Sequence, residues 1–246
     1  MASQKDSPRG TPKHGQSQEA AGAGERPRRG RPPRISHESV VAAAVALAES
    51  EGPAQLTMAR VAAAVGATPM AVYRYIPNRE ALLADVNEAL IEQMDFELPA
   101  GVPWQQRVEA WMDTARAHFV ARPHAMAQLG SAESSSPAWM RAITPLLETL
   151  RDAGFSQEST ALGLVWVARL TIGVLVQEVC GSLSEDHLVN SLSSLGKDQM
   201  KPWLDLVPAF GELSDESFFE FAKVQAVSGL SALLAKDTRA RRAEGR

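Results

Sequence analysis

The sequence predicts an all-α protein in which a small three-helix domain at the N-terminus precedes a larger helical domain. Apolar residues recur at helical spacing in successive segments, no segment alternates like a half-buried strand, and Gly or Pro separates the segments. The chain has 246 residues, 45% of them hydrophobic and 22% charged, which suffices for two domains with full cores. We expect a basic arm over residues 1–35, the small domain over 36–83, the larger domain over 84–236 and a charged tail over 237–246.

The expected arm differs from the rest of the chain in charge and composition. It contains eight Lys or Arg against three Asp or Glu, a net charge of +5, although the whole chain carries −4. It is rich in Gly, Pro, Ser and Gln and lacks periodic apolar positions, so we expect a mobile tail. A basic arm on an acidic body is the distribution expected when only one end of a protein meets a polyanion.

Capping and breaking residues divide the small domain. Ser36 or His37 can cap a first helix, whose apolar positions continue until Gly52-Pro53 ends it. Thr57 can cap a short second helix, and Gly66 supplies the left-handed turn that follows. Pro69 suits the first turn of a third helix, and a longer fourth helix begins at Arg79.

The larger domain contains further helical segments separated by breaks such as Arg122-Pro123, Gly154-Phe155 and Gly211. The segments at 156–180 and 215–235 carry wide apolar faces, more than one thin domain can bury. We therefore expect a two-fold four-helix interface and a homodimer. The predicted helices are 104–121, 124–132, 137–153, 156–180, 185–196 and 215–235.

The segment from Thr57 to Ile76 is the most specific pattern in the chain. Two short helices meet through Gly66, and a small residue, Ala62, stands where they would cross. Val61, Val65 and Val72 are expected to face inward. This spacing is typical of a helix-turn-helix that reads DNA, and an ordinary helical hairpin is the alternative.

The third helix is expected to present the residues that read DNA. Arg74 can donate two hydrogen bonds to a guanine edge, and Thr68 and Met70 can touch thymine methyl groups. The alternative is that its tyrosines pack against the domain and that Arg74 is a solvated charge. The full expected set adds Pro69 and Tyr75, which also face outward, and Thr57, Tyr73 and Arg79 at phosphates.

The arm offers a second contact with DNA. Its Arg-Gly-Arg-Pro run, which includes Arg31 and lies just before Arg34, resembles the core of an AT-hook. Such a segment can lie in a narrow minor groove, where arginine is favoured. A basic tail that meets phosphates without order is the alternative.

Residues 36 to about 85 resemble the N-terminal domain of the TetR family of bacterial repressors. The resemblance rests on the run from Leu56 to Leu83, including Val72-Tyr73-Arg74-Tyr75. It implies an all-helical homodimer in which a ligand in the C-terminal domain moves a connector helix and separates the two DNA-reading domains. The implied fold is thus an N-terminal three-helix HTH DNA-binding domain plus a C-terminal helical ligand-binding and dimerisation domain. Repression is the family default.

A weaker resemblance, to the tetracycline-repressor members of that family, extends into the larger domain. It rests on short runs such as Leu170-Thr171-Ile172-Gly173. Where those repressors engage a drug-bound magnesium with His and Glu, this chain has Gln128 and Gln177, which are poor ligands for a hard cation. We therefore predict no metal and no tetracycline–magnesium complex. The pocket positions carried over are Trp111, Ala115, Gln128, Leu146, Arg169 and the partner subunit's Gln177.

Further aromatic and apolar side chains suggest the class of effector. Met140, Trp166 and Leu170, together with Trp111, favour a small, largely apolar or aromatic molecule, oriented by Arg169 and Gln128. The alternative is that these aromatic residues belong to the core. A second alternative for the whole protein is a DNA-binding regulator whose C-terminal domain only dimerises or binds a protein partner.

The sequence favours no enzymatic chemistry. We find no Gly-rich phosphate loop, nucleophile elbow, paired acids or metal-ligand spacing, and we expect no cofactor and no catalytic residues. The single cysteine, Cys180, excludes an internal disulfide and is expected to be structural. The apolar stretch from Ala161 to Val179 is interrupted by polar residues, so we expect a buried helix, no membrane span and a cytoplasmic protein whose DNA partner is a palindromic operator.

Overall fold

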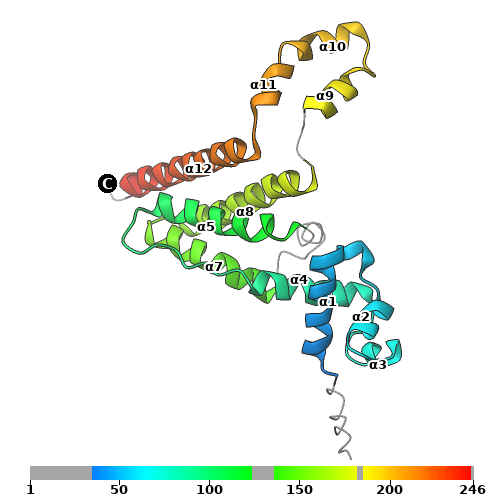
Figure 1. Ribbon diagram of the computed structural model, residues 1–246. Coiled ribbons are helices and arrows are strands. Elements are labelled where there is room, and N and C mark those ends of the chain that lie inside the picture. The colour runs from blue at the N-terminus through cyan, green and yellow to red at the C-terminus, as the bar shows by residue number, and fades with distance from the viewer. Residues whose placement is uncertain (1–34, 124–135, 182–184, 245–246) are drawn as a thin grey trace, which may run out of the picture. The chain divides into compact units, whose positions relative to one another are not determined.

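A computed structural model describes residues 35–123, 136–181 and 185–244. Over these ranges the chain is all-α, as the sequence predicted (Figure 1). The N-terminal domain consists of α1 (His37–Glu51), a short 3₁₀ turn η1 (Pro53–Gln55), α2 (Met58–Ala64), α3 (Pro69–Tyr73) and α4 (Arg79–Glu92). The C-terminal domain consists of α5 (Trp104–Val120), α7 (Pro137–Asp152), α8 (Gln157–Cys180), α9 (Glu185–Leu192), α10 (Lys197–Leu204), α11 (Val207–Glu212) and α12 (Asp215–Glu244).

Side-chain caps start all four α-helices of the N-terminal domain. Ser36 forms a reciprocal capping box with Ser39, and Thr57 Oγ1 accepts a hydrogen bond from Arg60 N at 3.3 Å. Thr68 and Asn78 accept equivalent bonds at the starts of α3 and α4. Each cap satisfies an amide that the helix itself leaves without a partner, which contributes about 1 kcal/mol. The cap at Thr57 was predicted from the sequence.

Small and branched residues pack the N-terminal domain. Ala62 is fully buried where α2 meets α3, and Gly66 has the left-handed φ of 68° that the turn between them requires. Val61 and Val72 face inward as predicted, whereas Val65 is only half-buried. The other fully buried residues of this domain are Val40, Ala44, Leu56, Ile76, Leu82 and Val86.

Helix α4, the last helix of the N-terminal domain, also contacts the C-terminal domain. It packs against α1 on one side and against α7 on the other. Glu88 Oε1 accepts a hydrogen bond from Ala138 N, in the first turn of α7, at 2.6 Å. Arg141, one turn further along α7, pairs with both Glu88 and Glu92. A carboxylate at the N-terminus of α7 is also favoured by the helix dipole, so α4 is joined to α7 by charge as well as by packing.

Helices α5, α7, α8 and α12 form the helical bundle of the C-terminal domain. Its core includes Trp111, Met112, Leu150, Leu175 and Phe219. Helices α8 and α12 approach closely at Gly163, where an added Cβ would lie 2.8 Å from Leu230 Cδ2. A larger residue there would force the two helices apart.

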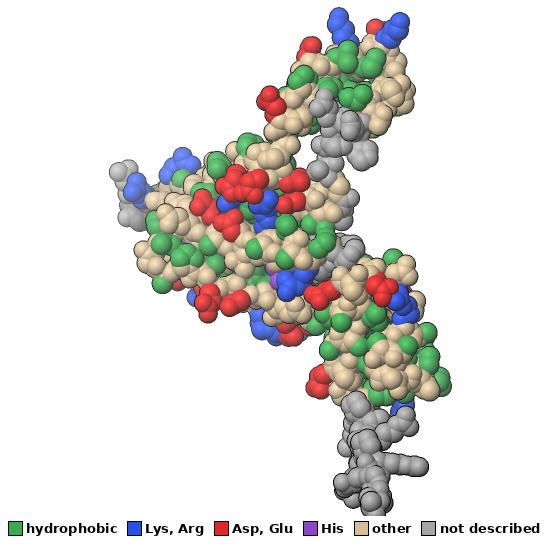
Figure 2. Space-filling view, in the orientation of Figure 1, with side chains coloured by type: hydrophobic (Ala, Val, Ile, Leu, Met, Phe, Trp, Pro, Cys, Tyr) green, Lys and Arg blue, Asp and Glu red, His purple; other side chains and the backbone are tan. Residues whose placement is uncertain are grey.

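An ion cluster joins the start of α12 to α5 and α8. Arg116 donates to both carboxylate oxygens of Glu178, at 2.9–3.1 Å, and also pairs with Glu216. Its guanidinium carbon lies 4.9 Å from the ring centroid of buried Phe219, and Lys223 Nζ lies 5.6 Å from the same centroid. The hydrogen bond to Glu178 is the main cause that raises the pKa of Arg116. Figure 2 shows charged side chains of both signs gathered beside the start of α12.

Two helix boundaries and two whole helices differ from the sequence prediction. The last helix was expected to end near residue 235 but continues to Glu244, and the helix expected over 185–196 ends at Leu192. Helices α10 and α11 were not predicted. Trp203 of α10 and Phe210 of α11 lie with ring centroids 6.5 Å apart, and α11 packs against α9. The helix predicted over 124–132 lies outside the described residues.

Two described helices, α8 and α12, are long and apolar enough to cross a membrane by length and composition alone. Helix α8 contributes Val167 and Leu175 to the core of the bundle, where both are fully buried. A core helix of a water-soluble bundle passes the same test, so the finding is weak evidence for a membrane span.

Candidate DNA interface and effector domain

Helix α3 presents a continuous exposed surface. Val72 and Ile76 are fully buried and fix the orientation of the helix, which turns the remaining side chains outward. Met70 is 76% exposed, more than either Tyr73 or Tyr75. The exposed residues are Thr68, Pro69, Met70, Tyr73, Arg74 and Tyr75, which are the six that the sequence predicted to face DNA from this helix.

Two residues predicted to touch DNA also hold the domain together. Arg79 Nε donates to Leu56 O at 2.9 Å, and its second nitrogen donates to Pro53 O at 3.0 Å, so its guanidinium fastens the η1 turn ahead of Thr57. Tyr75 Oη donates to Ile35 O at 2.9 Å and ties the end of α3 to the residue before the α1 cap. Arg31 and Arg34 lie outside the described residues.

Part of the predicted effector set lies in the bundle core. Trp111, Ala115 and Leu146 are all at most 4% exposed. Trp111 Nε1 donates to Ala142 O at 2.8 Å, and its ring stacks on Phe96 at a centroid distance of 5.2 Å. These contacts give Trp111 the packing of a core residue. Gln128 lies outside the described residues.

The rest of the predicted set lies at or near the surface. Met140 and Trp166 are 45% and 43% exposed, Arg169 and Gln177 are exposed, and Leu170 is half-buried. Trp166 and Leu170 line a groove of about 570 Å³ between α8 and α12, together with Phe218, Phe221 and Gly229. The described structure therefore separates the predicted effector residues into a core group and a surface group.

Pro145 lies three residues after Ala142, whose carbonyl accepts the hydrogen bond from Trp111. It stands inside α7 and removes the amide that would bond to the Arg141 carbonyl. Next to that weakened turn, a cavity of about 300 Å³ lies between the end of α4 and α7. Phe96, Met94 and Ile91 line one side of the cavity, and Arg141 lines the other.

A second link between the domains also escaped the sequence prediction. Arg122, just after α5, donates from Nε to Glu49 of α1 at 3.1 Å and from NH1 toward His118 Nδ1 at 3.4 Å. His118 is 8% exposed. Burial, followed by the positive charge of Arg122, lowers the pKa of His118 from 6.5 to about 4, so His118 is neutral at physiological pH.

Within the described ranges, no group of three or more His, Cys, Asp or Glu side chains is placed to hold a metal ion. What the N-terminal domain does present is a short exposed helix, set by a buried alanine and a left-handed glycine against its partner helix. This arrangement defines the helix-turn-helix class of DNA-binding proteins.

Comparisons with known proteins agree with that class. Residues 40–86 match the family described as "Bacterial regulatory proteins, tetR family". The HTH-type transcriptional repressor DrrR1 of Streptomyces coeruleorubidus is 26% identical over 228 residues, covering 87% of this chain and 83% of that protein. The class E tetracycline repressor protein of Escherichia coli is 26% identical over 209 residues, covering 82% and 93%.

Solved structures of regulators share the fold. The apo structure of ActR from Streptomyces coelicolor has a TM-score of 0.71 at 20% identity, covering 82% of this chain and 98% of ActR. A possible TetR family regulator from the same organism has a TM-score of 0.70 at 23% identity, covering 80% and 100%. Together with the family match over residues 40–86 and the curated relatives, these likenesses support a TetR family transcriptional regulator. Proteins of this family bind DNA and are not enzymes.

Proposed function

We propose that this chain is a homodimeric repressor that binds a near-palindromic operator and leaves it when a small, largely apolar or aromatic molecule occupies the C-terminal domain. The exposed face of α3 carries the DNA-binding part of the proposal. Arg74 provides a bidentate donor for guanine, and Thr68 and Met70 provide methyl groups that suit thymine. Thr57, Tyr73 and Arg79 are proposed to bind phosphates, and Arg31 and Arg34 the adjacent minor groove.

The outer face of α8 and α12 supports the proposed dimer. Leu162, Val165 and Trp166 of α8 are 43–54% exposed, and Phe218, Phe221 and Val224 of α12 are 47–59% exposed. So large an apolar patch on one subunit is unfavourable in water, and a second copy seated on it by a two-fold axis would bury it. Two copies would then present two α3 helices to successive major grooves, which is why the operator is expected to be palindromic.

The position of α4 supports control by an effector. This helix contacts α1 of the DNA-binding domain and α7 of the bundle, so a ligand that moves α7 would also move the DNA-binding domain. ActR has been solved in complex with actinorhodin and with (S)-DNPA. A similar fold in this chain is consistent with a small effector, and a regulator that acts on operator DNA is expected in the cytoplasm.

The test is to locate the operator and then release the protein from it. Footprinting on DNA that flanks the gene for this chain should protect two half-sites about one helical turn apart. Removing residues 1–34 should weaken binding and flatten its salt dependence, because fewer phosphates would be neutralised. Protection of a single, asymmetric site would contradict the dimeric repressor.

One observation favours the alternative in which the C-terminal domain only dimerises or binds a protein. Trp111, Ala115 and Leu146, expected at an effector pocket, are packed in the core. A thermal-shift screen with apolar and aromatic compounds separates the two readings. A compound that raises the melting temperature and also lowers operator affinity supports the effector, and a screen with no stabilising compound supports the alternative.

A further inference from the structure

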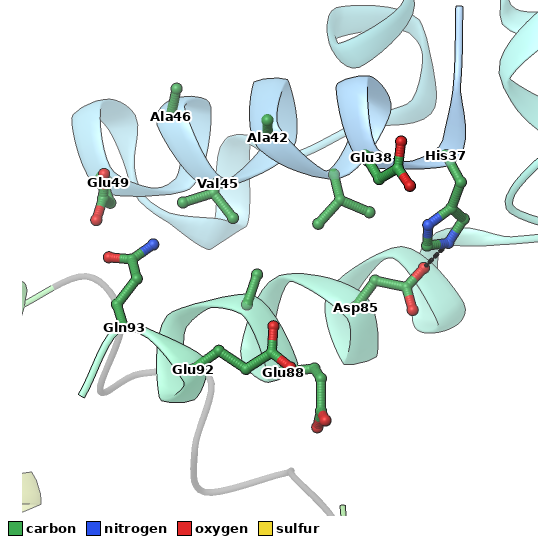
Figure 3. Close-up of a pocket in the computed structure, with 12 residues that line it drawn as sticks. His37, Glu38, Ala42, Val45, Ala46, Glu49, Asp85, Glu88, Glu92 and Gln93 are labelled. Atoms are coloured by element: carbon green, nitrogen blue, oxygen red, sulfur yellow. Dashed lines mark hydrogen bonds and ion pairs between the residues drawn. The ribbon is translucent and has the colours of Figure 1, made fainter. Parts of the chain in front are cut away.

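A groove of about 590 Å³ runs between α1 and α4 of the N-terminal domain. Its floor is apolar and is formed by Val41 and Val45 of α1 and Ala89 of α4, with Ala42 and Ala46 along its edge. Figure 3 shows Val45 pointing between the two helices, midway along the groove. The volume lies within the range of small-molecule sites in proteins.

Carboxylates stand at both ends of this apolar floor. Glu38 and Asp85 lie at one end, and Glu49 lies at the other beside Gln93 (Figure 3). Glu88 and Glu92 of α4 complete the acidic lining, and no Lys or Arg is among the described residues that line the groove. His37 also lines it, and its Nε2 lies 2.9 Å from Asp85 Oδ2 (Figure 3), so a ligand ammonium would share Asp85 with this imidazole. A molecule in the groove therefore meets apolar surface in the middle and negative charge at each end.

Most of these carboxylates have cationic partners outside the groove. Arg122 reaches Glu49, and Arg141 reaches Glu88 and Glu92. These pairs are partly exposed, and exposed pairs contribute little to stability, so a bound cation can compete for the same oxygens. Glu38 forms no hydrogen bond or ion pair of its side chain with any described residue.

The spacing of the carboxylates sets the length of a suitable ligand. Along α1, eleven residues separate Glu38 from Glu49, which corresponds to about 16 Å at the helical rise. Along α4, seven residues separate Asp85 from Glu92, or about 10 Å. A single ammonium group reaches one end only, whereas a chain with an ammonium at each end reaches both.

We infer that the α1–α4 groove binds a linear aliphatic diamine or polyamine. The terminal ammonium groups pair with Glu38 and Asp85 at one end and with Glu49 and Glu92 at the other. The methylene chain covers Val41, Val45 and Ala89, which removes apolar surface from water on both molecules. This site is separate from the C-terminal domain, and the inference stands independently of the proposed effector.

Three compounds of equal chain length test the inference by calorimetry on the full-length protein without DNA. They are octane with an amine at each end, octylamine, and octane with a hydroxyl at each end. The diamine should bind at least tenfold more tightly than octylamine at the same ionic strength, and the diol should not bind. Equal affinity for diamine and octylamine would overturn the two-ended site.

Variants at the groove complete the test. Glu38→Gln removes a carboxylate that forms no side-chain hydrogen bond or ion pair with any described residue, so it should leave the fold intact. It should reduce diamine affinity toward that of octylamine, with Asp85 still present at the same end of the groove. Glu97→Gln, an exposed residue outside the groove, is the matched control and should leave the affinity unchanged. Equal losses in both variants would indicate nonspecific charge screening and would refute the site. Operator binding, measured without any amine, reports separately on the proposed function.

Discussion

Arg74 is the only Lys or Arg between Thr68 and Ile76, the stretch that forms α3 and its caps. Its neighbours on the exposed face are hydroxyl, thioether and aromatic side chains, none of which carries a full charge. In the proposed complex the α3 surface would therefore rely on one guanidinium for a bidentate contact with guanine.

Replacing Arg74 with alanine should weaken operator binding by about 1–3 kcal/mol and relax the base preference at one position of each half-site. Fluorescence anisotropy on the operator and on single-base variants measures both effects. Arg151→Ala, an exposed arginine in α7, is the control. If specificity is unaltered while affinity falls uniformly, Arg74 contacts phosphate instead of a base.

His118 lies at the junction of α5 with the N-terminal domain. Its lowered pKa means that the unfolded chain binds a proton below about pH 6.5, whereas the folded chain does so only near pH 4. The contribution of neutral His118 to stability is therefore full above pH 6.5 and is lost as the pH falls toward 4.

The unfolding free energy should fall by about 2–3 kcal/mol more in the wild type than in His118→Gln between pH 6.5 and 4. Urea unfolding at several pH values measures the difference, and carboxylate titrations cancel in the comparison. Parallel slopes for the wild type and His118→Gln would contradict the assigned burial.

Sequence reasoning identified what individual residues do locally but not what they do at a distance. The cap at Thr57 was predictable because its partner, Arg60 N, lies three residues away. The hydrogen bonds of Arg79 to the carbonyls of Leu56 and Pro53 were not predicted, because those residues lie 23 and 26 positions earlier. A periodic pattern carries no information about such pairs.

At the scale of elements, the end of α12 shows why one boundary was missed. Its apolar pattern fades after Leu234, which led to a predicted end near residue 235. Polar contacts hold the last turns in place: Asp237 accepts from Ser156 N and Ser159 Oγ, and Arg241 donates to Gly154 O at 2.8 Å. The hydrogen bond from Ser156 N is also the main cause that lowers the pKa of Asp237.

The unpredicted helices have a different explanation. Helix α10 contains Pro202, and α11 begins with Pro208 in its first turn and includes Gly211. Pro202 and Gly211 lower helix propensity, and each helix is at most eight residues long. Apart from the end of α12, the longer helices of the bundle were predictable to within a few residues because their apolar periodicity extends over several turns.

The ion cluster at the start of α12 yields a prediction at this scale. Replacing Arg116 with methionine should destabilise the protein by about 2–3 kcal/mol, because Glu178, whose side chain is 10% exposed, would lose its partner. Urea unfolding measures the change, and Lys236→Met, at an exposed position of α12 outside the ion cluster, is the control. A loss below about 0.5 kcal/mol would show that water replaces the guanidinium.

At the scale of the whole molecule, the apolar face of α8 and α12 predicts self-association. Phe221→Asp should convert a dimer to a monomer and reduce operator affinity, because a charge would be buried at the centre of the interface. Sedimentation velocity measures the mass. Leu204→Asp, an equally exposed residue on α10, is the control and should remain dimeric. A wild-type chain that sediments as a monomer would contradict the interface itself.

The sequence predicted the overall fold more accurately than it predicted the residues of an effector pocket. Helical periodicity and the helix-turn-helix pattern led to the correct class and family. The effector residues were assigned one position at a time from a distant resemblance, and such an assignment does not fix which face of a helix turns inward. Trp111 and Arg169, both carried over in this way, illustrate the limit, since Trp111 is buried in the core and Arg169 is exposed.

The hydrogen bond from Trp111 to Ala142, beside Pro145, has a spectroscopic consequence. An indole held in an apolar core and donating to a fixed carbonyl emits at shorter wavelength than one surrounded by water. Any rearrangement that slides α7 past α5 would break this bond and shift the emission to the red. With the other tryptophans replaced by phenylalanine, Trp111 would be the only tryptophan of the chain. Motion of α7 relative to α5 would then be visible in stopped-flow fluorescence without an added dye.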